Sequence, residues 1–127
     1  MRKILFTILS VFVFSTCSTC KVTKLSPIRE IQYGSGGGFT GNVTAYTLKS
    51  DGTLWRQNKQ IAKLSCEELS PIFELAEQLP KENYVQPGNM YSFIQVVMKD
   101  TIFYYSWTAD KVPDLKVTEL YTKLNKQ

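Results

Sequence analysis

The spacing of hydrophobic and polar residues in the first half of the chain predicts strands. Apolar and polar side chains alternate with a period of two over residues 28–33, 43–49 and 53–57, which is the spacing of a half-buried strand. The sequence Ser50-Asp51-Gly52-Thr53 joins the last two as a hairpin, because Asp-Gly accepts the positive φ angles of a tight turn. Residues 60–64 could add a further short strand.

After the predicted strands, the apolar residues recur at the spacing of a helix. Ser65 and Glu68 form a capping box, with serine at the N-cap and glutamate three positions later. Pro71 permits a second start, because proline is favoured at the first helical position and would then make Ser70 the cap. In either case the pattern predicts a helix that ends at about Leu79.

A second hairpin and a final helix complete the predicted fold. Residues 91–98 and 101–107 are rich in β-branched and aromatic side chains, and Lys99-Asp100 joins them as a tight turn. Near the end of the chain, apolar residues recur at helical spacing and would form one stripe of a helix: Val117, Leu120, Tyr121 and Leu124. The prediction is an α+β fold, an antiparallel sheet of about five strands in the order β-β-β-α-β-β-α, with both helices packed on one face.

The aromatic residues of the second hairpin fall on both faces of the predicted sheet. Alternation places Phe103, Tyr105 and Trp107 on one face and Tyr104 on the other. We expect one aromatic face to pack beneath the helices. An exposed aromatic face would be an interaction site.

The amino-terminal residues have the layout of an export signal. Arg2 and Lys3 precede an apolar run over residues 4–14, and small polar residues follow. This run is shorter than the roughly twenty apolar residues that a membrane-spanning helix needs. A lipoprotein signal ends just before a cysteine that becomes the acylated amino terminus. Cys17 directly follows the apolar run and is the expected lipidation site, with Cys20 as the alternative.

The expected organisation is therefore a lipoprotein signal peptide at residues 1–16, a lipidated tether at 17–27 and a single α+β domain at 28–127. Ordinary cleavage without acylation is the other interpretation of this region. Cys66 is the remaining cysteine. A Cys20–Cys66 disulfide could form in an oxidising compartment, but the tether position of Cys20 argues against it, and we expect a buried free thiol at Cys66.

Composition excludes several classes of function. The net charge of +4 includes Arg2 and Lys3 of the signal, and the remaining charges alternate in sign, so no nucleic-acid partner is expected. The chain contains no histidine, which excludes histidine-based triads and histidine-containing zinc sites. No catalytic or metal-site spacing is present among the carboxylates or cysteines. We expect a non-enzymatic protein that needs no cofactor or metal.

The most distinctive motif is the segment Gly34-Ser35-Gly36-Gly37-Gly38-Phe39-Thr40-Gly41. Together with the hairpin at residues 46–52 and the Leu64-Ser65 helix start, it resembles a group of small lipoproteins of Bacteroidetes-type bacteria. More distantly it resembles the emfourin family, small protein inhibitors of thermolysin-like metallopeptidases. That family has a Ser-Gly-Gly-Phe-Ala-Gly-like segment between its first two strands. This chain differs in having an extra glycine and Thr40 in place of alanine.

Two interpretations of the glycine-rich segment follow. In the first, an exposed loop enters a partner's cleft, and its contact residues are Gly36, Gly37, Gly38, Phe39, Thr40 and Gly41. In the second, the segment is a wide connection between strands, with Phe39 filling the core. A phosphate-binding loop does not fit, because a strand follows the segment and no lysine is placed in it.

The expected function is that of a protein-binding module anchored in the cell envelope. Acyl chains would hold it at the outer membrane. The resemblance implies that its protein partner is a metallopeptidase, which it inhibits. The alternative is a structural or assembly component of an envelope complex. The acidic run that marks surface export in Bacteroidetes-like lipoproteins is missing, so the resemblance implies a periplasm-facing position.

Overall fold

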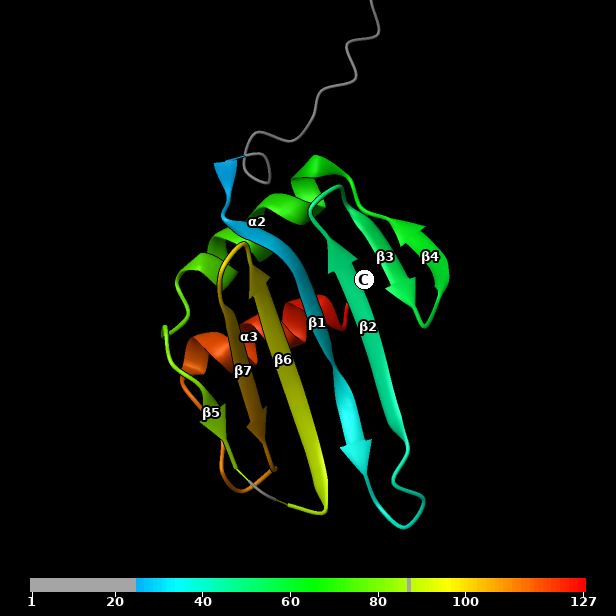
Figure 1. Cartoon of the computed structure of the whole chain (residues 1–127), viewed down its shortest axis with the longest axis vertical. Coiled ribbons are helices and arrows are strands. Elements are labelled where there is room, and N and C mark those ends of the chain that lie inside the picture. The colour runs from blue at the N-terminus through cyan, green and yellow to red at the C-terminus, as the bar shows by residue number, and fades with distance from the viewer. Residues whose placement is uncertain (1–24, 87) are drawn as a thin grey trace, which may run out of the picture.

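The structure, a computed structural model, describes residues 25–86 and 88–127, and in them a seven-stranded sheet carries two helices (Figure 1). The strands are β1 (Ile28–Gly37), β2 (Val43–Lys49), β3 (Thr53–Arg56), β4 (Lys59–Lys63), β5 (Tyr84–Val85), β6 (Met90–Met98) and β7 (Ile102–Trp107). The helices are α2 (Cys66–Glu77), between β4 and β5, and α3 (Leu115–Leu124), after β7. The predicted α+β class is confirmed. The predicted signal peptide, Cys17 and Cys20 lie outside the described residues.

The strand order across the sheet is β4-β3-β2-β1-β6-β7-β5. Neighbouring strands are antiparallel except β5, which runs parallel to β7. The expectation of about five strands is too low: β4 is the further short strand allowed at residues 60–64, and β5 is a strand that the sequence did not indicate. Strand β5 consists of only two residues within a polar segment, and two residues are too few to show a period in the sequence.

Strand β1 is longer than the sequence predicts. It was expected to stop at Tyr33 but continues to Gly37, so that Gly34 lies opposite Phe93 and Gly36 opposite Tyr91 on β6. A Cβ atom at Gly36 would lie 2.7 Å from the Tyr91 hydroxyl oxygen. The ring of Tyr91 therefore occupies the space that a side chain at position 36 would need. Gly36 therefore leaves room for a ring of β6, whereas at Gly34 a Cβ atom would meet the Thr44 carbonyl oxygen of β2.

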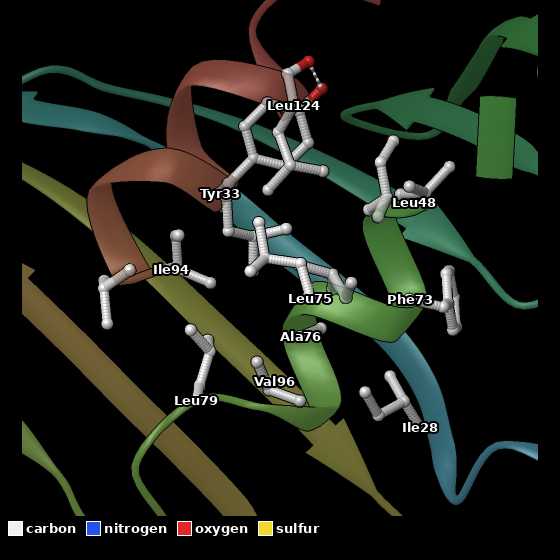
Figure 2. Packing of buried hydrophobic residues seen from close by; sticks show 14 of the residues in the cluster. Ile28, Tyr33, Leu48, Phe73, Leu75, Ala76, Leu79, Ile94, Val96 and Leu124 are labelled. Atoms are coloured by element: carbon white, nitrogen blue, oxygen red, sulfur yellow. Dashed lines mark hydrogen bonds between the residues drawn. The ribbon is translucent and has the colours of Figure 1, made fainter. Parts of the chain in front are cut away.

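The hydrophobic core lies between the sheet and the two helices, which cover the same face (Figure 1). Figure 2 shows residues of the sheet and both helices packed together there. The most deeply buried residues include Ile31, Leu48, Ile94 and Val96 of the sheet and Phe73, Ala76, Leu120 and Leu124 of the helices. Tyr105 and Trp107 are buried in this core and Phe103 packs against it. The three residues share one face, as the alternation predicts, and the structure shows that this face is the one beneath the helices.

Side-chain caps fix where the helices begin. The Ser65 hydroxyl oxygen accepts a hydrogen bond from the Glu68 backbone amide at 3.3 Å, so α2 begins at Cys66. The alternative start at Ser70 is wrong, because Pro71 lies inside the helix. Helix α3 is held on β1 by the Tyr33 hydroxyl, which donates to the Leu124 carbonyl oxygen at 3.2 Å (Figure 2).

Candidate functional site

The candidate site is the connection between β1 and β2, residues 38–42, called here the hairpin tip. It lies at the end of the sheet opposite the first residues of β1 (Figure 1). Gly38 and Gly41 have φ angles of 84° and 63°, a conformation that glycine adopts without a steric penalty. The Gly41 amide donates to the Gly38 carbonyl oxygen at 3.2 Å. The two glycines therefore close a turn around Phe39 and Thr40.

Phe39 is fully exposed at this turn, with a relative accessibility of 109%. The expectation that Phe39 fills the core is wrong. The last paired residues below the turn are Gly36 and Val43, so Phe39 lies beyond the paired strands and does not belong to the core between the sheet and the helices. A fully exposed aromatic ring forfeits about 2 kcal/mol of burial free energy, which makes it a candidate contact residue.

The base of the hairpin tip is held by the neighbouring chain segment. The Gly38 amide donates to the Asn89 carbonyl oxygen at 2.8 Å, and Gly37 is paired with Met90. A Cβ atom at Gly37 would lie 1.6 Å from the same Asn89 oxygen, so the two backbones are in close contact. The tip therefore projects from a base that is hydrogen-bonded on both sides, through β2 and through residues 89–90.

The surroundings of the tip are apolar and neutral. Met90 and Val43 are 72% and 54% exposed at the same end of the sheet. Beside them is a hollow of about 330 Å³, whose lining includes Ser35, Asn42, Thr44, Tyr91, Ser92 and Trp107. No charged side chain lines it. Neutral hydroxyl and amide groups next to apolar side chains suit contact with a peptide or protein surface better than an ionic ligand.

The sequence-predicted site residues separate into two groups. Gly36 and Gly37 belong to β1 and pair with β6, so their assignment to an exposed loop is wrong. Gly38, Phe39, Thr40 and Gly41 do form the exposed connection. Met90 was not found from the sequence, because nothing in its neighbourhood indicates that β6 begins beside the hairpin tip.

Three aromatic rings lie on the face of the sheet that the helices leave open. Phe93 is between Tyr91 and Tyr104, with ring centroids 6.3 Å and 6.1 Å apart. Phe93 is buried although it faces away from the helices, and burial raises the pKa of Tyr104. Tyr91 and Phe93 lie opposite Gly36 and Gly34 of β1, and the Tyr91 ring occupies the space that a Cβ atom at Gly36 would need. These rings therefore pack against the sheet itself.

Cys66 differs from its predicted state. It is exposed at the start of α2 and is disulfide-bonded. The expectation of a buried free thiol is therefore wrong. Its Sγ atom also lies 3.6 Å from the Ser70 hydroxyl oxygen.

Three titratable groups with shifted pKa values, Tyr33, Tyr105 and Asp51, lie outside the hairpin tip. Burial raises the pKa of Tyr33 and of Tyr105 to about 12. A side-chain hydrogen bond from Thr53 lowers the pKa of Asp51 at the β2–β3 turn. The tip itself, residues 38–42, contains no ionisable side chain. Binding by the tip alone should therefore be insensitive to pH.

Within residues 25–86 and 88–127, no cluster of three or more acidic, cysteine or histidine side chains could hold a metal ion. In the same part of the chain, no helix is both long and apolar enough to cross a membrane. In comparisons with known proteins, no protein family, curated protein or solved structure gives a significant match to this chain. The emfourin likeness thus stays an expectation from the sequence.

Proposed function

We propose that this chain is a lipid-anchored protein of the cell envelope that binds another protein through its hairpin tip. The observation that carries the proposal is the full exposure of Phe39 on a turn whose base is hydrogen-bonded on both sides. An aromatic side chain on a preorganised support loses little conformational entropy when it enters a pocket. The tip therefore has the properties of an anchor residue in an interface.

The anchoring part of the proposal is supported by the sequence and by the fold. The apolar run and the two early cysteines have the layout of a lipoprotein signal. The described chain enters the fold at the end of β1 that is farthest from Phe39 (Figure 1). A tether on that side would leave the hairpin tip free to meet a partner. The disulfide at Cys66 agrees with an oxidising compartment such as the periplasm.

The sharpest form of the proposal is inhibition of a thermolysin-like metallopeptidase, with the tip inserted into the cleft of the enzyme. The resemblance of the glycine-rich segment to emfourin supports this partner. The geometry supports insertion, because the tip is a two-stranded projection with Gly38 and Gly41 on either side of Phe39. Residues without Cβ atoms allow the backbone to approach another surface closely.

The test is a titration of secreted thermolysin-like metallopeptidases with the full-length protein in detergent, followed by peptide hydrolysis. We expect half-inhibition at about micromolar concentration or below, and F39A should weaken inhibition at least about tenfold, as expected for a buried anchor. The matched control is I102A. Ile102 is another exposed apolar side chain, 52% accessible, at the opposite end of the sheet.

Inhibition that is equal for F39A and the unchanged protein would contradict the role of the tip. Absence of inhibition for every peptidase would contradict the inhibitor form of the proposal. In that case, fixed envelope partners that bind F39A and I102A equally well would favour the structural or assembly role instead.

A further inference from the structure

Part of strand β2 has a neighbour on one side only. Strand β2 pairs with β1 along its whole length, but β3 covers its other side only at Tyr46, Thr47 and Leu48. Figure 1 shows β2 running well beyond the end of β3. Within residues 25–86 and 88–127, no strand pairs with residues 43–45 on the side away from β1. This outer side of residues 43–45 is called here the β2 edge.

The backbone of the β2 edge presents hydrogen-bonding groups outward. The Ser50 amide donates to the Arg29 carbonyl oxygen at 3.0 Å, in register with the pairing of β1 and β2. In an antiparallel pair, residues that bond to one neighbour alternate with residues that face away from it. The even-numbered residues of β2 therefore bond to β1, and the amides and carbonyl oxygens of Val43 and Ala45 face outward. Such unpaired groups are a template for another extended chain.

There is room for a further strand at the β2 edge. A hollow of about 190 Å³ lies there, and its lining comes from β2 and from the end of β3: Val43, Thr44, Ala45, Thr47, Arg56 and Gln57. Gln57 has a φ angle of 55° and begins the turn from β3 into β4. The chain therefore turns back after Arg56, and the hollow lies where β3 would otherwise continue along β2.

The outermost strand on this side of the sheet is protected against pairing, whereas the β2 edge is not. Strand β4 has Lys59 and Lys63 at its two ends, and its register with β3 shifts between Leu54 and Trp55. Lysines and bulges are the usual devices that keep edge strands from pairing with other chains. The β2 edge consists of three uncharged residues, whose register with β1 is regular.

We propose that the β2 edge binds an extended peptide segment of a partner protein as an additional antiparallel strand, which continues the line of β3. The amides and carbonyl oxygens of Val43 and Ala45 hold the backbone of this segment. The proposal goes beyond the role of the hairpin tip, because backbone pairing at the β2 edge requires no contact with Phe39.

The groups around the hollow define the chemistry of the segment. Arg56 is exposed, its guanidinium carbon lies 5.7 Å from the centroid of the Tyr46 ring, and no acidic side chain lines the hollow. A strand that continues β3 begins beside Arg56, so its first residue is acidic. Val43 is 54% exposed, and an apolar side chain opposite it gains a cross-strand contact. The segment is therefore an acidic residue followed by uncharged, partly apolar residues.

A second copy of this chain fits the β2 edge less well than a peptide segment. Antiparallel pairing of two β2 edges through Thr44 would place Asn42 of one copy opposite Tyr46 of the other. Arg56 already pairs with Tyr46 on that side, so the two chains would collide. A peptide segment can leave the sheet before it reaches this position.

The test is an NMR titration of the isotope-labelled full-length protein in detergent with the peptide acetyl-Glu-Val-Thr-Val-Thr-amide. Its glutamate matches Arg56, and its valines match Ala45 and Val43. We expect a Kd of about 1 mM or below, as for about four net backbone hydrogen bonds. Bound peptide should slow hydrogen exchange of the Val43 and Ala45 amides at least about tenfold, and leave the Thr44 amide, already bonded to β1, unchanged. Unchanged exchange at Val43 and Ala45 would overturn the proposal.

A proline variant removes one outward donor without removing a bond to β1. Val43 is the first residue of β2, a position where proline is tolerated. V43P should weaken peptide binding about fivefold, the effect of one net hydrogen bond, whereas the control V43T keeps the amide and should bind like the unchanged protein. Equal binding by the two variants would contradict pairing at the β2 edge.

Two further comparisons separate the remaining explanations. R56Q should weaken binding about threefold for the glutamate peptide, but not for the same peptide with glutamine in place of glutamate. Slow exchange of the Val43 and Ala45 amides without peptide, increasing with protein concentration, would assign the edge to a second copy and overturn the proposal. F39A should bind the peptide as the unchanged protein does, so the β2 edge and the hairpin tip are tested independently.

Discussion

Replacing Gly34 by alanine should strongly destabilise the fold, although the change adds only one methyl group. Gly34 is buried in the central strand β1 and pairs with β2 and β6. A Cβ atom built there would lie 1.8 Å from the Thr44 carbonyl oxygen. Tyr121 adds a further restraint, because its hydroxyl donates to the Gly34 carbonyl oxygen at 3.1 Å.

The expected loss of stability follows from the displacement that the methyl group requires. Real Cβ contacts are essentially never closer than 3.0 Å, so β1 and β2 must separate locally by more than 1 Å. Such a shift breaks about two ladder hydrogen bonds, each worth about 1 kcal/mol. Overpacking adds about 1–3 kcal/mol. The free energy of unfolding should therefore fall by about 4 kcal/mol.

Urea denaturation of the full-length protein, followed by circular dichroism, measures this change. With a slope of about 2 kcal/mol/M, the midpoint should fall by about 2 M. G38A is the matched control. A Cβ atom at Gly38 meets nothing within 4 Å, and only its positive φ opposes the change, which costs about 1–2 kcal/mol.

Equal losses for G34A and G38A would refute the reasoning. They would mean that backbone conformation, and not the close contact of two strands, determines the requirement for glycine in this segment. A loss below about 1 kcal/mol for G34A would show that the sheet adjusts around position 34 at little cost.

Three further changes have defined outcomes. S65A should lower the free energy of unfolding by about 1 kcal/mol, measured by urea denaturation, because it removes the α2 N-cap bond; no change in midpoint would contradict this role. L120A should cost about 2–5 kcal/mol in the same assay, because Leu120 is completely buried, and a loss below about 1 kcal/mol would contradict its place in the core. Stability should fall as pH rises from about 10 to about 12, because burial raises the pKa of Tyr33 and Tyr105 to about 12, so the folded state binds protons that the unfolded state releases. Urea midpoints across this range, compared with those of Y33F, measure the effect, and it should be smaller in the variant.

Much of the fold can be predicted from local patterns. The hairpin of β6 and β7, the turn at Asp51-Gly52, the Ser65 cap and the buried stripe of α3 all agree with the structure. Each of these features depends on residues within about one or two turns of the chain, whose periods and turn preferences are visible in the sequence. The α+β class with both helices on one face follows from them.

The candidate site was predicted only in part. The sequence indicated the glycine-rich segment as the most distinctive feature, but it placed Gly36 and Gly37 in a loop and allowed Phe39 to fill the core. Whether a glycine belongs to a strand depends on the residue that pairs with it. Gly36 pairs with Tyr91 and Gly37 with Met90. These partners lie more than fifty positions later in the chain, so the local pattern does not reveal them.

Neighbours along the chain were enough to predict the type and order of most elements and the apolar faces that meet in the core, but they left two starts open for α2, at Ser65 and at Ser70. Tertiary structure alone decided the length of β1, the pairing of β5 with β7, the exposure of Phe39 and the paired state of Cys66. The length of β1 and the pairing of β5 depend on residues brought close from distant parts of the chain, and Phe39 is exposed because it lies beyond the paired strands. The local pattern contains no record of these arrangements.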